Sequence, residues 1–113
     1  VRNAEVYRKS FAISVCPAEY IESPTIVGAQ AANELLNVIG IKASFVLTEY
    51  NNKIFVSARS IDEINVQIIM ERLGGGGHLN VAGAQLVDCT IESAKRIIKD
   101  TLEEMLREGD IES

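Results

Sequence analysis

The stretch KASFVLTEYNNKIFVSARS (residues 42–60) decides the expected architecture. It holds two runs rich in β-branched and aromatic residues, Lys42–Tyr50 and Lys53–Ser60, which only Asn51 and Asn52 separate. Asparagine tolerates the positive φ angles that both central residues of a two-residue hairpin turn require. The stretch therefore predicts two antiparallel strands joined by a tight turn.

The segment before this hairpin predicts one strand and one helix. Phe11–Cys16 alternates in side-chain size, which indicates a strand with two usable faces. Ser23 followed by Pro24 is typical of a helix N-terminus, and Gly40 is the expected stop. The side chains expected to face inward share helical spacing: Val27, Ala31, Leu35 and Val38.

The segment after the hairpin predicts two helices and a short strand. Ser60 and Glu63 form a capping-box pattern, so a helix is expected from Ile61 until Gly74 ends it. The later segments are expected to form a helical turn, a strand and a final amphipathic helix capped by Thr90 and ended by Gly109: residues 78–82, 85–88 and 91–108. The order predicts a single α/β domain, with a mixed β-sheet of about four to five strands and flanking helices.

Composition and charge exclude several classes of protein. The 113 residues are 47% hydrophobic and 24% charged, as in one ordinary globular domain. The formal net charge is −5, and residues 61–113 carry most of the acid, so attraction to a nucleic-acid backbone is not built in. No apolar run suggests a membrane span, and Cys16 and Cys89, outside any CxxC spacing, are expected to be reduced and buried.

Four consecutive glycines followed by a histidine are the most unusual feature of the chain: Gly74, Gly75, Gly76, Gly77 and His78. Glycine leaves the backbone N–H groups uncovered, so such a loop can surround an anion, and His78 can add a donor. A flexible linker is the alternative, but apolar segments flank this run on both sides. One histidine and two distant cysteines do not make a metal site, so metal chemistry is expected to come from elsewhere.

Arg59 marks a second candidate anion site. It directly precedes Ser60, the expected helix cap, so its guanidinium is expected beside the positive end of a helix dipole. The alternative is an ion pair with a nearby carboxylate such as Glu63. Asn65, one turn further on, is either an exposed helix residue or a polar contact at the same site.

These motifs together resemble a known family. Ser57-Ala58-Arg59-Ser60, then Ile64-Asn65-Val66, then the glycine run with His78 and Ala82-Gly83-Ala84, resemble the DHH-associated C-terminal domain of DHH-type phosphodiesterases, most closely the GdpP-type cyclic di-AMP phosphodiesterases. The resemblance covers about residues 11–106.

The resemblance implies a substrate-binding role without catalytic residues in this chain. Phosphate or nucleotide contacts are then expected from Arg59, Ser60, the four glycines and His78, with Asn65 as a further contact. A preceding DHH domain would bind two manganese ions and hydrolyse cyclic di-AMP to linear pApA. Residues 1–10 would be the linker from that domain, residues 11–108 the substrate-binding domain, and residues 109–113 a tail.

Two other functions fit the same motifs. One is the corresponding domain of a soluble phosphodiesterase that degrades linear di- and oligonucleotides, and the other is a nucleic-acid-binding module without hydrolysis. A homodimer through the final helix is compatible with the cyclic di-AMP phosphodiesterase function. The family implies that this domain lies on the cytoplasmic side and makes no direct membrane contact of its own. The parent protein can itself be anchored in the membrane, as in the GdpP type.

Overall fold

The computed structural model describes residues 4–16, 24–61 and 63–112. One mixed sheet organises them, with the strand order β1-β2-β3-β4-β6-β5. Its strands are β1 Glu5–Tyr7, β2 Phe11–Cys16, β3 Ala43–Tyr50, β4 Lys53–Ser60, β5 Gly76–Gly77 and β6 Val81–Val87. β2 and β3 are parallel, and all other neighbouring strands are antiparallel.

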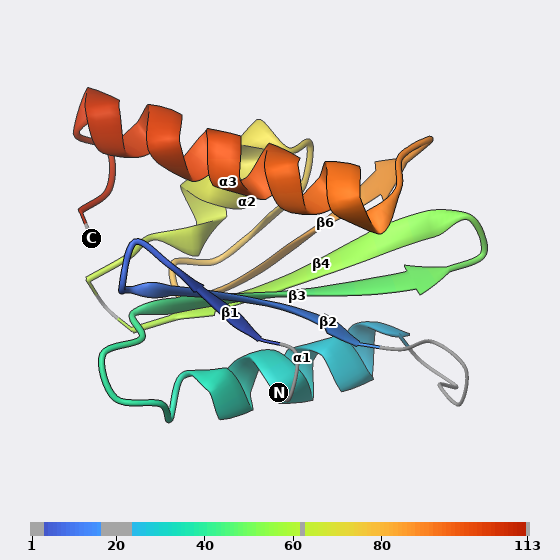
Figure 1. Ribbon diagram of the computed structural model, residues 1–113, viewed down its shortest axis with the longest axis horizontal. Helices are drawn as coiled ribbons and strands as arrows, with labels where there is room; N and C mark the ends of the chain where they lie inside the picture. Colours follow the sequence, from blue (N-terminus) through green and yellow to red (C-terminus); the bar gives the residue numbers. More distant parts are fainter. Residues whose placement is uncertain (1–3, 17–23, 62, 113) are drawn as a thin grey trace.

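Three helices among the described residues cover the sheet, which confirms the α/β class. They are α1 Pro24–Leu35, α2 Val66–Arg72 and α3 Ile91–Glu108. Figure 1 shows α1 on one face of the sheet, with α2 and α3 on the other. The sheet has six strands, above the expected four to five. The two unexpected strands, β1 and β5, are three and two residues long, too short for a period-two pattern to reveal.

The predicted hairpin is confirmed. Asn51 and Asn52 have φ angles of 53° and 62°, and Tyr50 pairs with Lys53. Positive φ at both central residues is the geometry that matches the twist of the two strands.

Alternation along the strands divides the apolar side chains between two layers. The larger core lies between the sheet and the α2–α3 layer, and its largest members include Phe11, Ile13, Phe45, Leu47, Ile54, Ile69, Ile98 and Leu102. The smaller core lies under α1 and consists of Ala12, Ala32, Leu35, Ile41 and Val46. Cys16 and Cys89 are only half-buried, so their expected burial is not met.

The predicted inward face and end of α1 are partly wrong. The helix ends at Leu35, and Val38, expected inward, is 47% exposed. Tighter hydrogen bonds, including one from Val38 N–H to Leu35 O, replace the helical ones before Gly40 turns the chain with φ +90°. The expected cap, Ser23, lies outside the described residues.

The predicted start of α2 is also wrong. Ser60 is the last residue of β4, where it pairs with Ala43, and Asn65 caps a helix that begins only at Val66. The capping-box pattern failed because β4 extends through Ser60, and its buried hydroxyl donates to Ile64 O at 2.6 Å instead of capping a helix.

β6 begins four residues earlier than the expected strand. Residues 78–82 form no helical turn, because the His78 N–H donates to Val81 O at 2.7 Å and closes a hairpin over Leu79 and Asn80. The final helix is confirmed, with Thr90 as N-cap and Gly109, at φ +81°, as C-cap. Beyond it, Ile111 is buried against the core.

Candidate anion-binding groove

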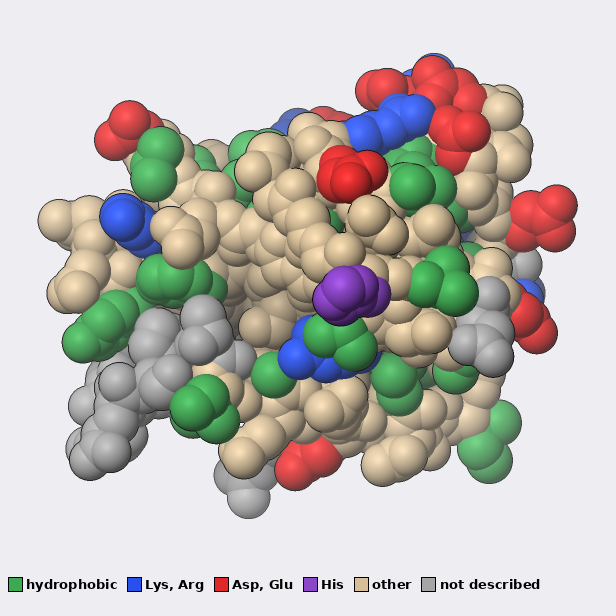
Figure 2. All heavy atoms as spheres, turned by 180° about the vertical axis from the view of Figure 1, so that it is seen from behind, with side chains coloured by type: hydrophobic (Ala, Val, Ile, Leu, Met, Phe, Trp, Pro, Cys, Tyr) green, Lys and Arg blue, Asp and Glu red, His purple; other side chains and the backbone are tan. Residues whose placement is uncertain are grey.

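The candidate site lies on the part of the sheet that extends beyond α1. A groove of about 630 Å³ opens there between β4, β6 and the glycine run. Arg59, all four glycines and His78 line it, so the structure brings together the two anion sites that the sequence suggested separately. Figure 2 shows this face, where the histidine (purple) lies beside a basic side chain (blue).

Register pairs place these residues in rows across the strands. Arg59 on β4 pairs with Val81 on β6, and Val81 O accepts from His78 N–H. Residues directly opposite one another in an antiparallel ladder point their side chains to the same face. Because neighbouring strands are roughly 5 Å apart, the Cα atoms of Arg59 and His78 are separated by about 10 Å. Two donors therefore flank one exposed valine.

Arg59 is a half-buried cation without a carboxylate partner among the described residues. Its one hydrogen bond there is to Ala58 O at 2.8 Å, and burial lowers the pKa of its guanidinium. The alternative pairing with Glu63 is wrong, since Glu63 pairs with Lys42 at 2.9 Å. A desolvated cation in this setting favours an anionic ligand.

The glycine run has two structural tasks besides lining the groove. The N–H groups of Gly74 and Gly75 donate to Glu71 O and Met70 O, at 3.1 and 2.8 Å, and thereby end α2. Those two amides are consequently occupied. Gly77 is the last residue of the edge strand β5, directly before His78, whose N–H donates to Val81 O on β6. Because N–H directions alternate along an antiparallel strand, the Gly77 N–H is directed away from β6.

Two of the four positions require glycine because the chain passes very close to β6. A Cβ on Gly75 would lie 2.1 Å from Gly83 O, and one on Gly77 would lie 2.5 Å from Ala82 Cα. A Cβ on Gly76 would meet nothing within 4 Å. The run is therefore packed closely against β6, and its last two residues form β5. This packing argues against the linker interpretation.

Ser60 and Asn65 do not line the groove. Ser60 Oγ joins the end of β4 to Ile64 O, while Asn65 Oδ1 accepts from Gln67 and Ile68 N–H at 3.0 and 3.4 Å as the cap of α2. Both side chains therefore form hydrogen bonds with backbone groups of residues 64–68, at the start of the helix that leads into the glycine run.

Sequence reasoning missed three side chains that line the groove: Phe55, Ser57 and Gln85. The period of two along β4 could have revealed the first two, because residues 55, 57 and 59 share one face of that strand. Gln85 is the first residue of the predicted strand, and nothing in the sequence shows that it lies opposite Phe55.

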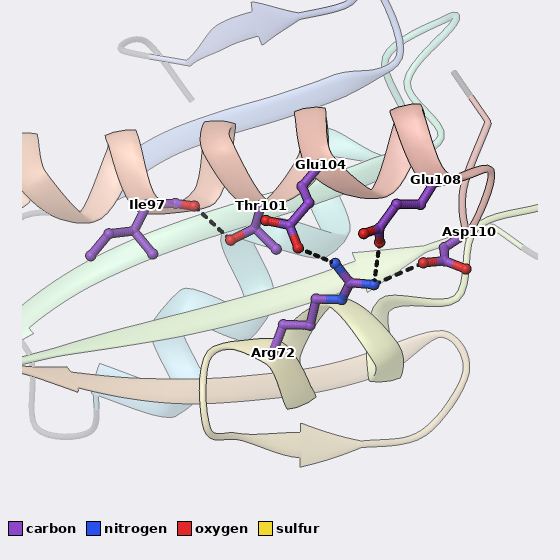
Figure 3. Close-up of polar contacts among 6 residues, drawn as sticks. All are labelled: Arg72, Ile97, Thr101, Glu104, Glu108 and Asp110. Carbon is purple, nitrogen blue, oxygen red and sulfur yellow. Dashed lines mark hydrogen bonds and ion pairs between the residues drawn. The ribbon is translucent and has the colours of Figure 1, made fainter.

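An ion cluster holds α2 just before the glycine run begins. Arg72 contacts Glu104, Glu108 and Asp110, at 2.8, 2.7 and 2.8 Å, as Figure 3 shows. The hydrogen bond from Arg72 to Glu108 is the main cause that lowers the pKa of Glu108. The cluster joins the last turn of α2 to the end of α3, so it fixes the direction in which the chain enters the groove.

Among the described residues, no three His, Cys, Asp or Glu side chains gather in a way that could hold a metal ion. None of the helices described combines the length and apolarity that crossing a bilayer requires.

Residues 9–108 match the model of the DHHA1 domain family. The chain belongs to this family. The DHHA1 match confirms the resemblance noted from the glycine run and Arg59.

The relatives of this DHHA1 domain include cyclic-di-AMP phosphodiesterases. It is 46% identical over 97 residues to the cyclic-di-AMP phosphodiesterase PdeA of Listeria monocytogenes. This aligned region covers 85% of this chain and 15% of that protein. It is 36% identical over 113 residues to GdpP of Bacillus subtilis, over 96% of this chain and 17% of that protein. The chain thus spans less than a fifth of these relatives.

A solved structure shares the fold. An exopolyphosphatase-related protein from Bacteroides fragilis superimposes with a TM-score of 0.80 at 25% identity, over 92% of this chain and 32% of that one.

Proposed function

We propose that this DHHA1 domain binds the phosphates of cyclic di-AMP within a phosphodiesterase that hydrolyses it to linear pApA. The observation that carries the proposal is the unpaired, half-buried Arg59 in one groove with His78 and the glycine strand. The family relatives named as cyclic-di-AMP phosphodiesterases supply the substrate class.

The described residues do not fit a manganese site, so the two manganese ions of the proposal belong to a DHH domain elsewhere in the parent protein. Those ions would supply the activated water. This domain contributes orientation and charge neutralisation, which are worth most where they act on a developing negative charge.

Arg59 is the principal phosphate ligand in this proposal. A guanidinium presents forked donors that match phosphate oxygens, and its partial burial strengthens the attraction. Losing a charge-assisted contact costs roughly 1.5–3 kcal/mol, which is about ten- to a hundred-fold in affinity.

His78 and the Gly77 amide complete the anion site from the other side. The imidazole lines the groove from the β5–β6 hairpin, and the Gly77 N–H is a donor of the edge strand, directed away from β6. A small ligand with two phosphates suits this arrangement better than a long polyanion. The chain has a net charge of −5 and lacks the basic stripe that tracking a nucleic acid requires.

The test is a titration of the ¹⁵N-labelled chain with cyclic di-AMP, pApA, AMP and a short single-stranded RNA. We expect amide shifts at Arg59 and Gly76–His78, with cyclic di-AMP or pApA binding most tightly. Arg59→Ala should weaken binding by about ten- to a hundred-fold, whereas the control Arg96→Ala, exposed on α3, should not. Equal affinities for the two variants, or tightest binding of RNA, would refute the proposal.

Activity in the parent enzyme gives an independent readout. Arg59→Ala and His78→Ala should each lower the turnover of cyclic di-AMP without lowering the melting temperature of the enzyme. Neither side chain belongs to the buried core. Normal kinetics in both variants would contradict a substrate-binding role for this groove.

A further inference from the structure

The groove continues along the sheet past the anion site. From Arg59 the same face of β4 presents Ser57 and then Phe55, and their partners on β6 are Gly83 and Gln85. Four residues of strand separate Arg59 from Phe55, or about 13 Å at about 3.3 Å per residue. The groove thus has a cationic end, a middle and an aromatic end.

The middle of the groove is flat because two of its three positions lack side chains. Ser57 pairs with Gly83, and Gly83 pairs with Gly76 on the edge strand. A Cβ on Gly83 would lie 2.9 Å from Val56 O, so this glycine is held in close contact with the neighbouring strand. Ser57 itself is buried, and a Cβ on Gly28 of α1 would lie 2.7 Å from its Oγ, so the open floor is formed by Gly83 and Gly76. A ring-shaped group such as a ribose can lie across these two glycines between the two ends.

The aromatic end offers a ring and an amide next to each other. Phe11 and Phe45 are fully buried in the core, whereas Phe55 is only partly buried and lines the groove. Gln85, directly opposite Phe55, is exposed. An aromatic face stacks on any base, while a glutamine amide can form two hydrogen bonds with N6 and N7 of adenine.

We propose that Phe55 and Gln85 form a nucleobase subsite, in which Phe55 stacks on the base and Gln85 selects adenine. This inference rests on the proposed function, because the phosphate held at Arg59 sets the distance at which the base lies. The arginine side chain reaches part of the way from Arg59 toward Phe55. The remaining distance matches the combined length of a phosphate, a ribose and a base.

The experiment compares ligands that share a phosphate and differ in the base. Dissociation constants for pApA, pGpG and ribose 5-phosphate are measured for the wild-type chain, Arg59→Ala, Phe55→Leu and Gln85→Ala. Phe55→Leu should weaken pApA by at least about five-fold, the lower end of base–aromatic stacking, and leave ribose 5-phosphate unchanged. Gln85→Ala should remove the preference for pApA over pGpG.

Matched controls separate the subsite from general effects on folding. Tyr50→Leu removes an exposed aromatic ring outside the groove, and Gln30→Ala removes an exposed amide on α1. Neither should change any dissociation constant. Phe55→Trp retains a stacking surface and should keep pApA affinity, which excludes an effect of altered packing.

The two proposals fail in different ways. If Arg59→Ala weakens all three ligands while Phe55→Leu acts on none, or on all equally, the base subsite is refuted and the phosphate site stands. If Phe55→Leu acts on pApA alone while Arg59→Ala has no effect, the subsite stands and the phosphate role falls. Absence of binding by all three ligands to the wild-type chain overturns both.

Discussion

Replacing Gly75 with alanine should destabilise the domain far more than the same change at Gly76. The new Cβ at position 75 would lie 2.1 Å from Gly83 O and 2.7 Å from Ala84 Cα, both backbone atoms that are held in the sheet. Over-packing of this kind costs about 1–3 kcal/mol. At roughly 4 °C per kcal/mol for a domain of this size, the melting temperature should fall by about 4–12 °C.

Gly76→Ala is the matched control, one residue further along the chain, at the first residue of β5. Its Cβ meets nothing within 4 Å, and its φ is not positive, so the substitution should be neutral or stabilise by about 0.4–1 kcal/mol through the unfolded chain. Thermal denaturation followed by circular dichroism measures both variants. Equal melting temperatures for Gly75→Ala and Gly76→Ala would refute the close-approach argument.

Three further outcomes are expected. Ser60→Ala removes the hydrogen bond to Ile64 O and should lower the free energy of unfolding by about 1 kcal/mol. The dissociation constant for nucleotide should stay the same, and a changed value would show that Ser60 contacts the ligand. Asn65→Ala removes the cap of α2 and should likewise cost about 1 kcal/mol, and urea denaturation measures it; unchanged stability would contradict the capping role. Arg72 lowers the pKa of Glu108 below its usual 4.5, so the stability from this pair is present above pH 4.5 and is lost as the pH falls through the folded-state pKa. The melting temperatures of wild type and Arg72→Met should therefore converge in acid, and a constant difference across that range would count against the ion cluster.

Local patterns predicted the elements whose ends depend on local chemistry. The Asn51-Asn52 turn needs only two residues that accept positive φ, and α3 needs only Thr90 before it and Gly109 after it. Both features are specified within a few residues, so the sequence alone was sufficient. The pattern of β2 was equally local, with alternation over Phe11–Cys16.

Elements defined by distant partners were predicted less well. Ser60 and Glu63 satisfy a capping pattern, yet Ser60 pairs with Ala43 and Glu63 pairs with Lys42. The two-residue strand β5 exists only because glycine backbones fit against β6. Pairing across the sheet overrode local propensity at each of these positions.

The candidate site was predictable at its charged end only. Arg59, His78 and the glycine run are conspicuous in the sequence. A strand-end arginine before a serine, and four glycines before the single histidine, are patterns that core packing alone does not require. Phe55 and Gln85 do not stand out, since an aromatic and an amide in a strand have ordinary interpretations. Their significance comes from the register that places them opposite each other, and register is not visible in one sequence.

The position of Arg59 explains why an anion site occurs at this part of the sheet. Under α1 the corresponding face is covered by apolar packing, but Val81, the partner of Arg59 on β6, remains 47% exposed. A guanidinium partly desolvated there, without a carboxylate partner among the described residues, raises the free energy of the unliganded fold. An anion that binds only the native state offsets that cost and stabilises the fold in proportion to the logarithm of its concentration. The same unpaired, partly desolvated charge therefore both costs the unliganded fold free energy and favours a phosphate ligand.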